Sequence, residues 1–351
     1  MKKVLLAGTA LCMGAGMAMA DVTVSGDGRM GIVSDADDNL KFDSRIRVKF
    51  GLSAELDSGL TAGGSIRADN ASGGASGTGG SVYLSGPFGK LSMGDVDPGA
   101  KAAIGHVASV GYRNLGDPHE ITYLRGGGDP TLQYELPKLG PVQVYASLGM
   151  ATTDVMENGE KVPAGYSTAI KKVPAGETAA NPLTVDGTGE VVDGTVTQEY
   201  KTMTEISADT LSIGAKADLA ISDMGTAWIG GGFEASTNEA HDGQLVVGAG
   251  ASISGFTGKV VVGMQGRDAN AAGESQDVEQ FAVSAGYSAG QIGVTVFYTD
   301  DKDYGGAEAL GAGFSWDLGG DTSLSAGFTN WPAEEGAEDR QTADLGVTFA
   351  F

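Results

Sequence analysis

Carboxylates and cations are unevenly distributed along this sequence, and their densest mixture lies between residues 95 and 130. The acidic members of this stretch are Asp95, Asp97, Asp117, Glu120 and Asp129. Fixed carboxylates can pair with cations or tune ion preference in a pore, and neither a nucleophile motif nor a metal-ligand spacing accompanies them here. A connection this long in a compact β protein is usually functional or disordered. We expect it to be functional, folding into a β-barrel and narrowing it.

A second set of charges lies nearer the N-terminus, on alternate residues that form one polar face. These cations are Arg29, Arg45, Arg47, Lys49 and Arg67. Burying them unpaired in a closed apolar core would cost several kcal/mol for each ion. A water-filled lumen removes that cost, so we expect the polar face to line a lumen and the apolar face to contact lipid.

The elements that must position these charges are β-strands, because apolar and polar residues alternate with a period of two throughout the chain. Strands are predicted at 22–33, 41–56, 60–69, 79–86, 89–95, 131–136, 141–150, 207–221, 226–235, 244–254, 256–267, 277–288, 290–299, 307–317, 321–331 and 342–351. Tight turns such as Ser254-Gly255 alternate with long loops such as 151–206. This pattern predicts an all-β fold, a 16-stranded antiparallel transmembrane β-barrel with short periplasmic turns and long extracellular loops.

The N-terminus has the features of an export signal. Lys2 and Lys3 precede a mostly apolar stretch that ends in Ala18-Met19-Ala20, so residues 1–20 are interpreted as a secretory signal peptide. Residues 21–351 then form a single barrel domain without cysteine, which excludes a disulfide framework. No later apolar run approaches the ~20 residues of a spanning helix. The formal net charge of −23 argues against nucleic acid as a partner.

Three segments resemble the general-diffusion porins of Gram-negative bacteria, in particular the alphaproteobacterial type. They are residues 21–26 (DVTVSG), residues 86–95 (GPFGKLSMGD) and residues 344–351 (DLGVTFAF). The resemblance covers the whole mature chain. It implies a trimeric pore in the cell outer membrane, with the third loop folded into the lumen. It also implies that the terminal Phe351 is read by the barrel-assembly machinery, and that lipid and lipopolysaccharide surround the barrel.

The same resemblance implies a charged constriction. In the family an acidic third loop faces a basic cluster on the opposite wall, and here those groups correspond to the five carboxylates and the five cations named above. Opposed charges would set a transverse field across the pore. Because the loop also holds Lys101, Arg113 and Arg125, two interpretations stay open: the acids face the lumen, or the charges pair with one another and hold the loop in place.

Other sequence motifs give weaker indications of function. Residues 26–31 match the glycine pattern of a dinucleotide site, but they lie inside a strand with no helix after it. His106, His119 and His241 fall in predicted loops without metal-ligand spacing. Because no nucleophile motif is present either, no catalytic residue is expected.

An acidic cluster at Asp35, Asp37 and Asp38 is a candidate Ca²⁺ site, since carboxylate-rich loops suit that ion. It could also bridge through divalent ions to lipopolysaccharide phosphates, and the plainer alternative is solvated charge. No cofactor is otherwise expected to be required.

The function expected from these observations is passive diffusion of small hydrophilic solutes and ions through a porin. Two alternatives stay open: a structural or adhesive barrel that binds an external partner through its long loops, and a barrel enzyme. The basic row on the lumen face favours a pore, and the positions of the histidines disfavour the enzyme.

Overall fold

The computed structural model describes residues 20–34, 39–71, 74–77, 79–124, 130–156, 184–185, 191–193, 202–223, 225–236, 241–267, 278–301, 308–332 and 339–351. The chain divides into two compact units. The first combines Met1–Gly149 with Asp209–Phe351, and the second is Met150–Ala208. The second unit contains a small two-stranded sheet of β9 (Thr184–Val185) and β10 (Val191–Asp193). Residues 1–19 of the expected signal peptide, and most of the long loop, lie outside the described residues.

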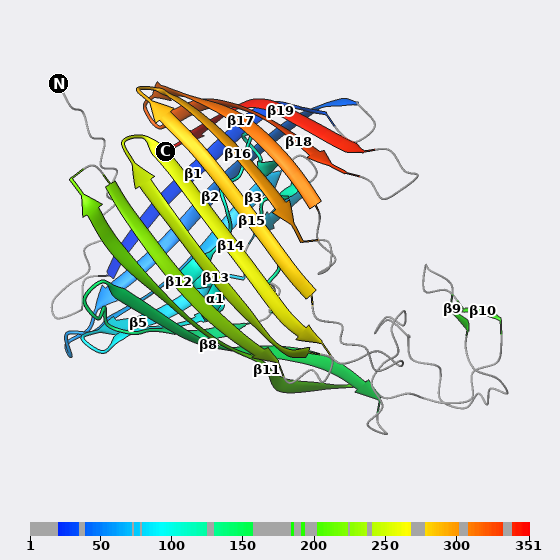
Figure 1. Ribbon diagram of the computed structural model, residues 1–351. Helices are drawn as coiled ribbons and strands as arrows, with labels where there is room; N and C mark the ends of the chain where they lie inside the picture. The colour runs from blue at the N-terminus through cyan, green and yellow to red at the C-terminus, as the bar shows by residue number, and fades with distance from the viewer. Residues whose placement is uncertain are drawn as a thin grey trace. The chain divides into compact units, whose positions relative to one another are not determined.

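One large antiparallel sheet dominates the structure (Figure 1). Its strands are β1 (Ala20–Ser34), β2 (Leu40–Glu55), β3 (Thr61–Ala71), β4 (Gly74–Gly77), β5 (Ser81–Gly86), β6 (Gly89–Gly94), β7 (Thr131–Glu135), β8 (Val142–Met156), β11 (Thr202–Ser222), β12 (Gly225–Ser236), β13 (His241–Ile253), β14 (Phe256–Arg267), β15 (Val278–Ala289), β16 (Ile292–Asp300), β17 (Glu308–Gly319), β18 (Thr322–Trp331) and β19 (Arg340–Ala350). β4 and β5 pair with successive parts of β3, so together they form one interrupted strand of a 16-stranded barrel.

The sheet closes on itself because β1 pairs with β2 on one side and with β19 on the other. At this seam the backbones of Gly26 and Phe351 exchange two hydrogen bonds, of 2.8 and 3.0 Å. The ring of Phe349 lies over Gly28 on the outer face, where an added Cβ would come within 2.4 Å of it. Glycine therefore makes room for the closing aromatic side chains.

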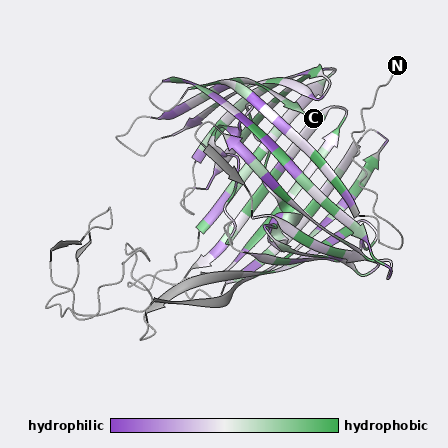
Figure 2. Ribbon diagram, turned by 180° about the vertical axis from the view of Figure 1, so that it is seen from behind, coloured by the Kyte–Doolittle hydropathy of each residue, from purple (hydrophilic) through white to green (hydrophobic). Residues whose placement is uncertain are grey.

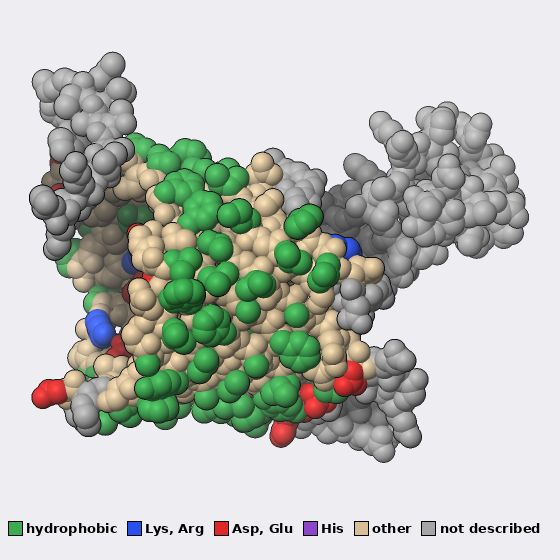
Figure 3. All heavy atoms as spheres, turned by 90° about the horizontal axis from the view of Figure 1, so that it is seen from above, with side chains coloured by type: hydrophobic (Ala, Val, Ile, Leu, Met, Phe, Trp, Pro, Cys, Tyr) green, Lys and Arg blue, Asp and Glu red, His purple; other side chains and the backbone are tan. Residues whose placement is uncertain are grey.

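The barrel is apolar outside and polar inside, as the alternation predicted. Phe42 of β2 is 90% exposed and Met30 of β1 is 59% exposed, and both point outward. Figure 2 shows apolar and polar residues alternating along the strands, and Figure 3 shows hydrophobic side chains spread over one outer face with carboxylates near its edges. In lipid such a surface is stable only when every backbone group is paired, which closure achieves.

All sixteen predicted strands are present, and the short turns lie between the strands where they were expected. The β13–β14 turn has positive φ at both Ser254 (49°) and Gly255 (87°), a pair of values typical of tight hairpins. β8 and β11 run several residues beyond the predicted limits of 150 and 207. Their extensions are rich in Thr and lack a clear apolar alternation, so backbone pairing extends beyond the sequence signal. Among the described residues, no helix is long and apolar enough to cross a membrane.

Residues 95–124, called the inner segment from here on, hold a short helix α1 (Gly99–Ile104) and a 3₁₀ turn (Asn114–Gly116). Apolar residues of the segment pack against inward-facing residues of the wall and form the buried core. The segment contributes Ala100, Ala103, Ile104, Val107, Val110, Leu115, Ile121 and Tyr123, and the wall contributes Val246, Val261, Ala282, Phe297 and Ala309. The core therefore lies on one side of the lumen, between the inner segment and β13 to β17.

Inward-facing glycines let the inner segment approach the wall closely. A Cβ on Gly232 of β12 would lie 2.5 Å from the Cβ of Ala100, and one on Gly214 of β11 would lie 2.8 Å from that of Ala103. On the far side, a Cβ on Gly327 of β18 would lie 2.6 Å from the backbone of Gly111. Any larger side chain at these positions would lift the segment off the wall.

This packing makes a prediction about stability. Replacing Gly232 by Val should lower the free energy of unfolding by about 1–3 kcal/mol, because overpacking against Ala100 forces the segment or the wall to shift. The unfolding temperature should fall accordingly. The temperature at which the folded band converts to the unfolded band on a gel measures this. Gly258→Val is the matched control, since the nearest atom to its added Cβ is 3.9 Å away. Equal losses in the two variants would contradict the role of close approach.

Candidate functional site

The first part of the inner segment is fixed to the wall through its backbone. The amides of Gly99 and Ala100, at the start of α1, donate to the hydroxyls of Ser147 (2.9 Å) and Ser212 (2.8 Å). At the other end of the helix, Lys259 Nζ donates to the carbonyl oxygens of Ile104 (2.6 Å) and His106 (2.5 Å). Both ends of α1, whose terminal amides and carbonyls lack partners within the helix, are thus satisfied by wall side chains.

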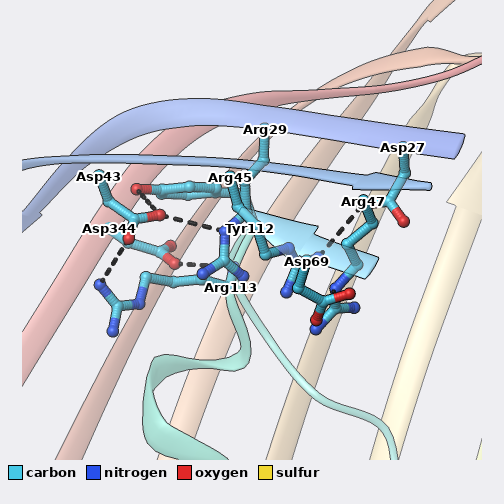
Figure 4. A network of polar contacts seen from close by, with 9 residues as sticks. All are labelled: Asp27, Arg29, Asp43, Arg45, Arg47, Asp69, Tyr112, Arg113 and Asp344. Atoms are coloured by element: carbon cyan, nitrogen blue, oxygen red, sulfur yellow. Dashed lines mark hydrogen bonds and ion pairs between the residues drawn. The ribbon is translucent and has the colours of Figure 1, made fainter. Parts of the chain in front are cut away.

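The middle of the segment reaches the seam of the barrel (Figure 4). The backbone amide of Arg113 donates to Asp344 of β19 at 3.2 Å, and the Arg113 guanidinium donates to Asp43 of β2 at 3.4 Å. The hydroxyl of Tyr112 donates to Asp43 as well, at 3.3 Å. Asp43 also forms an ion pair of 3.1 Å with Arg29, so one wall carboxylate links two arginines from different parts of the chain.

The last part of the segment returns along the wall and is held by buried amide and carboxylate side chains. The backbone of Thr122 exchanges hydrogen bonds with the side chain of Gln280, and the amide of Leu124 donates to both Glu234 and Gln244 at 2.8 Å. Glu234 and Gln244 are fully buried. A buried polar group is costly unless it is hydrogen-bonded, and these side chains keep their hydrogen bonds to Leu124 only while the segment stays in place.

The five predicted basic residues all lie on β1, β2 and β3 and face the lumen. Arg45 pairs with Asp27 at 3.2 Å, and Asp69 pairs with both Arg47 (3.0 Å) and Arg67 (2.7 Å). Lys49 is in register with Arg67 on the same face. Wall carboxylates therefore hold Arg29, Arg45 and Arg47, whereas the sequence had indicated only the acids of the loop as partners for these cations.

Four of the five predicted acids are described, and all four are exposed. The side chain of Asp97 is 55% exposed and forms an ion pair of 3.1 Å with Lys101, and that of Glu120 is 47% exposed. Asp95 and Asp117 are exposed as well. Asp129 lies outside the described residues, as does Arg125. The described acids thus face solvent, whereas the apolar side of the segment is packed against the wall.

Burial changes the protonation of groups in the inner segment. It lowers the pKa of His106 to about 4, with the neighbouring Lys101 acting in the same direction. Neutral His106 accepts a hydrogen bond at Nδ1 from the amide of Ile121 (3.1 Å). Burial and the nearby Asp117 raise the pKa of Glu120. His106 is therefore a structural acceptor near neutral pH rather than a charged group.

Several residues of this site were not selected from the sequence. Asp27, Asp43 and Asp69 share the polar face of the basic row, and the alternation could have identified them as its partners. Arg113 was expected only as one of the cations of the loop, and no local signal marks Tyr112. The partners of both residues are brought near only by barrel closure. The candidate Ca²⁺ ligands Asp35, Asp37 and Asp38 lie outside the described residues, so that site stays a prediction. Within the described ranges, no cluster of three or more His, Cys, Asp or Glu side chains could hold a metal ion.

Comparison with known proteins agrees with this architecture. The family model described as Gram-negative porin matches residues 7–221 and 203–351. A porin of Rhodobacter capsulatus is 30% identical over 336 residues, which cover 94% of this chain and all of the relative. Among solved structures, a refined porin superposes with a TM-score of 0.62 at 24% identity, and a mutant of the Rhodopseudomonas blastica porin with 0.59 at 17% identity. Each comparison covers 94% of this chain and the whole of the other chain.

The buried histidine predicts a pH effect. Because the pKa of His106 falls from 6.5 to about 4 on folding, the unfolded chain takes up its proton at a higher pH than the folded one. The contribution of His106 to the free energy of unfolding is constant above pH 6.5. As the pH drops from 6.5 towards 4, the free energy of unfolding falls by up to about 3 kcal/mol. His106→Asn can accept from Ile121 without titrating. Denaturation of both proteins over this pH range should show that the variant becomes more stable relative to the wild type as the pH falls.

The raised pKa values of Glu120 and Asp301 act in the opposite direction. Both groups are present in the two proteins, so their contributions largely cancel in the comparison. A stability difference between wild type and His106→Asn that does not change with pH would contradict a buried, neutral histidine.

Proposed function

Because this chain belongs to the Gram-negative porins and forms an outer-membrane pore for passive diffusion, we propose that it selects solutes where the inner segment narrows the lumen opposite the basic row. The observation that carries this proposal is the line along which the segment is anchored. The segment is hydrogen-bonded to β7, β8 and β11 through β16, and at the seam to β19 and to Asp43 of β2. Its exposed acids therefore border the free part of the lumen, which the basic row on β1 to β3 lines on the other side.

A fixed aperture limits solutes by size. The wall side chains that hold the segment include fully buried Glu234 and Gln244, whose polar atoms would lose partners if the segment moved. The aperture should therefore keep one width while small hydrophilic solutes and ions pass by diffusion.

The charges on the two sides favour a transverse field. The basic row has more cations than paired carboxylates, since Arg47 and Arg67 share Asp69. The inner segment presents Asp97 and Glu120, together with Asp95 and Asp117. Charged groups that line a pore tune its ion preference, and low-dielectric walls strengthen their field. Polar solutes would orient between the two sides as they pass.

Selectivity measurements test these roles. In a planar bilayer with a KCl gradient, Asp97→Asn combined with Glu120→Gln should shift the reversal potential towards anion preference, because negative charge is removed from the aperture. Arg47→Gln should shift it towards cation preference. Asp57→Asn, in a short turn away from the aperture, is the matched control and should leave it unchanged. Large conductance steps with the same reversal potential in every variant would reject this choice of residues.

We also propose that the mature protein, after removal of residues 1–20, assembles as a homotrimer among lipid and lipopolysaccharide. Phe351 would be recognised by the barrel-assembly machinery. Support comes from the porin family and from Phe351 itself, which is 61% exposed on the outer face at the seam. Mass spectrometry of the isolated protein checks the processing, and closure of single channels in groups of three steps checks the trimer. Single, independent closures would reject the trimer.

A further inference from the structure

An indole lies on the lumen wall between the inner segment and the short-turn end of the barrel. Trp228 of β12 is in register with Asp218 of β11 and with Gly250 of β13, which in turn is in register with Lys259 of β14. All of these positions lie on the face that also carries buried Glu234 and Gln244, so they point inward. The short turn before β12 is only a few residues away. The indole therefore lines the vestibule on that side of the aperture.

Part of the ring lies against the backbone of the neighbouring strand, and part of it packs against the buried core. A Cβ on Gly250 would come within 2.4 Å of Trp228 Nε1, and one on Gly248 would come within 3.2 Å of the other end of the ring. The indole thus covers two inward-facing glycines of β13. It stays partly exposed, so the ring is accessible from the lumen.

Positive charge surrounds this indole. Lys216 Nζ lies 5.3 Å and Lys259 Nζ lies 5.2 Å from the ring centroid, both within cation–π range. Asp218 pairs with Lys216 at 3.2 Å and with Lys138 at 3.4 Å. In the described part of the chain, it is the one carboxylate that forms an ion pair with these lysines. Two ammonium groups thus share a single acid beside an aromatic surface, and the ammonium group of Lys259 approaches the same ring.

The lysines also retain donors. An ammonium group has three N–H donors, and Lys259 gives two of them to the carbonyls at the end of α1. The side chain of Lys216 is 34% exposed, and its ion pair is with Asp218 of the wall rather than with the inner segment. An incoming carboxylate could therefore pair with Lys216 without releasing the segment from the wall.

We propose that Trp228, Lys216 and Lys259 form a binding station for aromatic carboxylates inside the pore. The planar ring of the solute stacks on the indole, and its carboxylate pairs with Lys216 and the remaining donor of Lys259. A neutral sugar fits less well, because the acceptor it would need, Asp218, is already shared by two lysines. The station rests on the pore being open, and it is separate from the charges of the aperture.

Benzoate is the probe, added to a planar bilayer that contains the full-length mature pore. Benzoate should reduce the KCl conductance in a saturable manner, whereas acetate and glucose at the same concentrations should not. The half-saturating concentration should rise about threefold in Lys216→Gln, the scale of an exposed ion pair. It should rise about tenfold in Trp228→Leu, the scale of a lost stacking surface. Lys90→Gln is the matched control, since Lys90 lies 4.7 Å from the ring of Tyr83 on another part of the wall.

The outcomes separate this proposal from the pore itself. Equal effects of benzoate and acetate would overturn the station, and so would unchanged half-saturation in Lys216→Gln. Trp228 also packs against the core, so the result for Trp228→Leu is used only if this variant keeps its KCl conductance. If the variant loses that conductance, the result for Lys216→Gln alone decides whether the station exists. Absence of KCl conductance in the wild type would reject the pore and the station with it.

Discussion

The position of the inner segment depends on hydrogen bonds between its backbone and polar side chains of the barrel wall. Most of the segment is neither helix nor strand, so few of its amides and carbonyls have partners of their own. Serines, glutamines, a threonine, a lysine and carboxylates of the wall supply those partners, and several of them are fully buried. Neither side is satisfied without the other, which makes the attachment specific as well as stable.

This attachment has an electrostatic counterpart on the opposite side of the lumen. The arginines of β1 to β3 need no partner from across the pore, because they form ion pairs with Asp27, Asp43 and Asp69 on the same wall. Such pairs keep long side chains in defined positions next to water. The acids of the inner segment can then stay exposed, and in the proposed function passing ions would meet charge on both sides of the aperture.

Much of this architecture follows from the sequence. Period-two alternation identified every strand of the barrel, because only one face of each strand can meet lipid. The same alternation placed Arg29 and its companions in the lumen. What the alternation could not reveal is which groups meet across the barrel. The contact of Arg113 with Asp43 joins positions 70 residues apart, and that of the Arg113 amide with Asp344 joins positions 231 apart. The inward glycines were equally uninformative about their partners. A glycine in a strand indicates that something approaches closely, but the sequence does not show which segment it is.

The seam between β1 and β19 has a consequence for the order in which the chain assembles. Ser34 bonds to Ala343 across 309 positions, and Gly26 and Gly28 receive the aromatic rings of the last three residues. The first strand must therefore keep its edge and its two glycine recesses open until β19 and the phenylalanines beside it are present. Contacts of such long range are slow to form, because loop closure must precede them. We therefore expect the seam to close after neighbouring strands have paired, because its two recesses can fill only once Phe349 and Phe351 reach them.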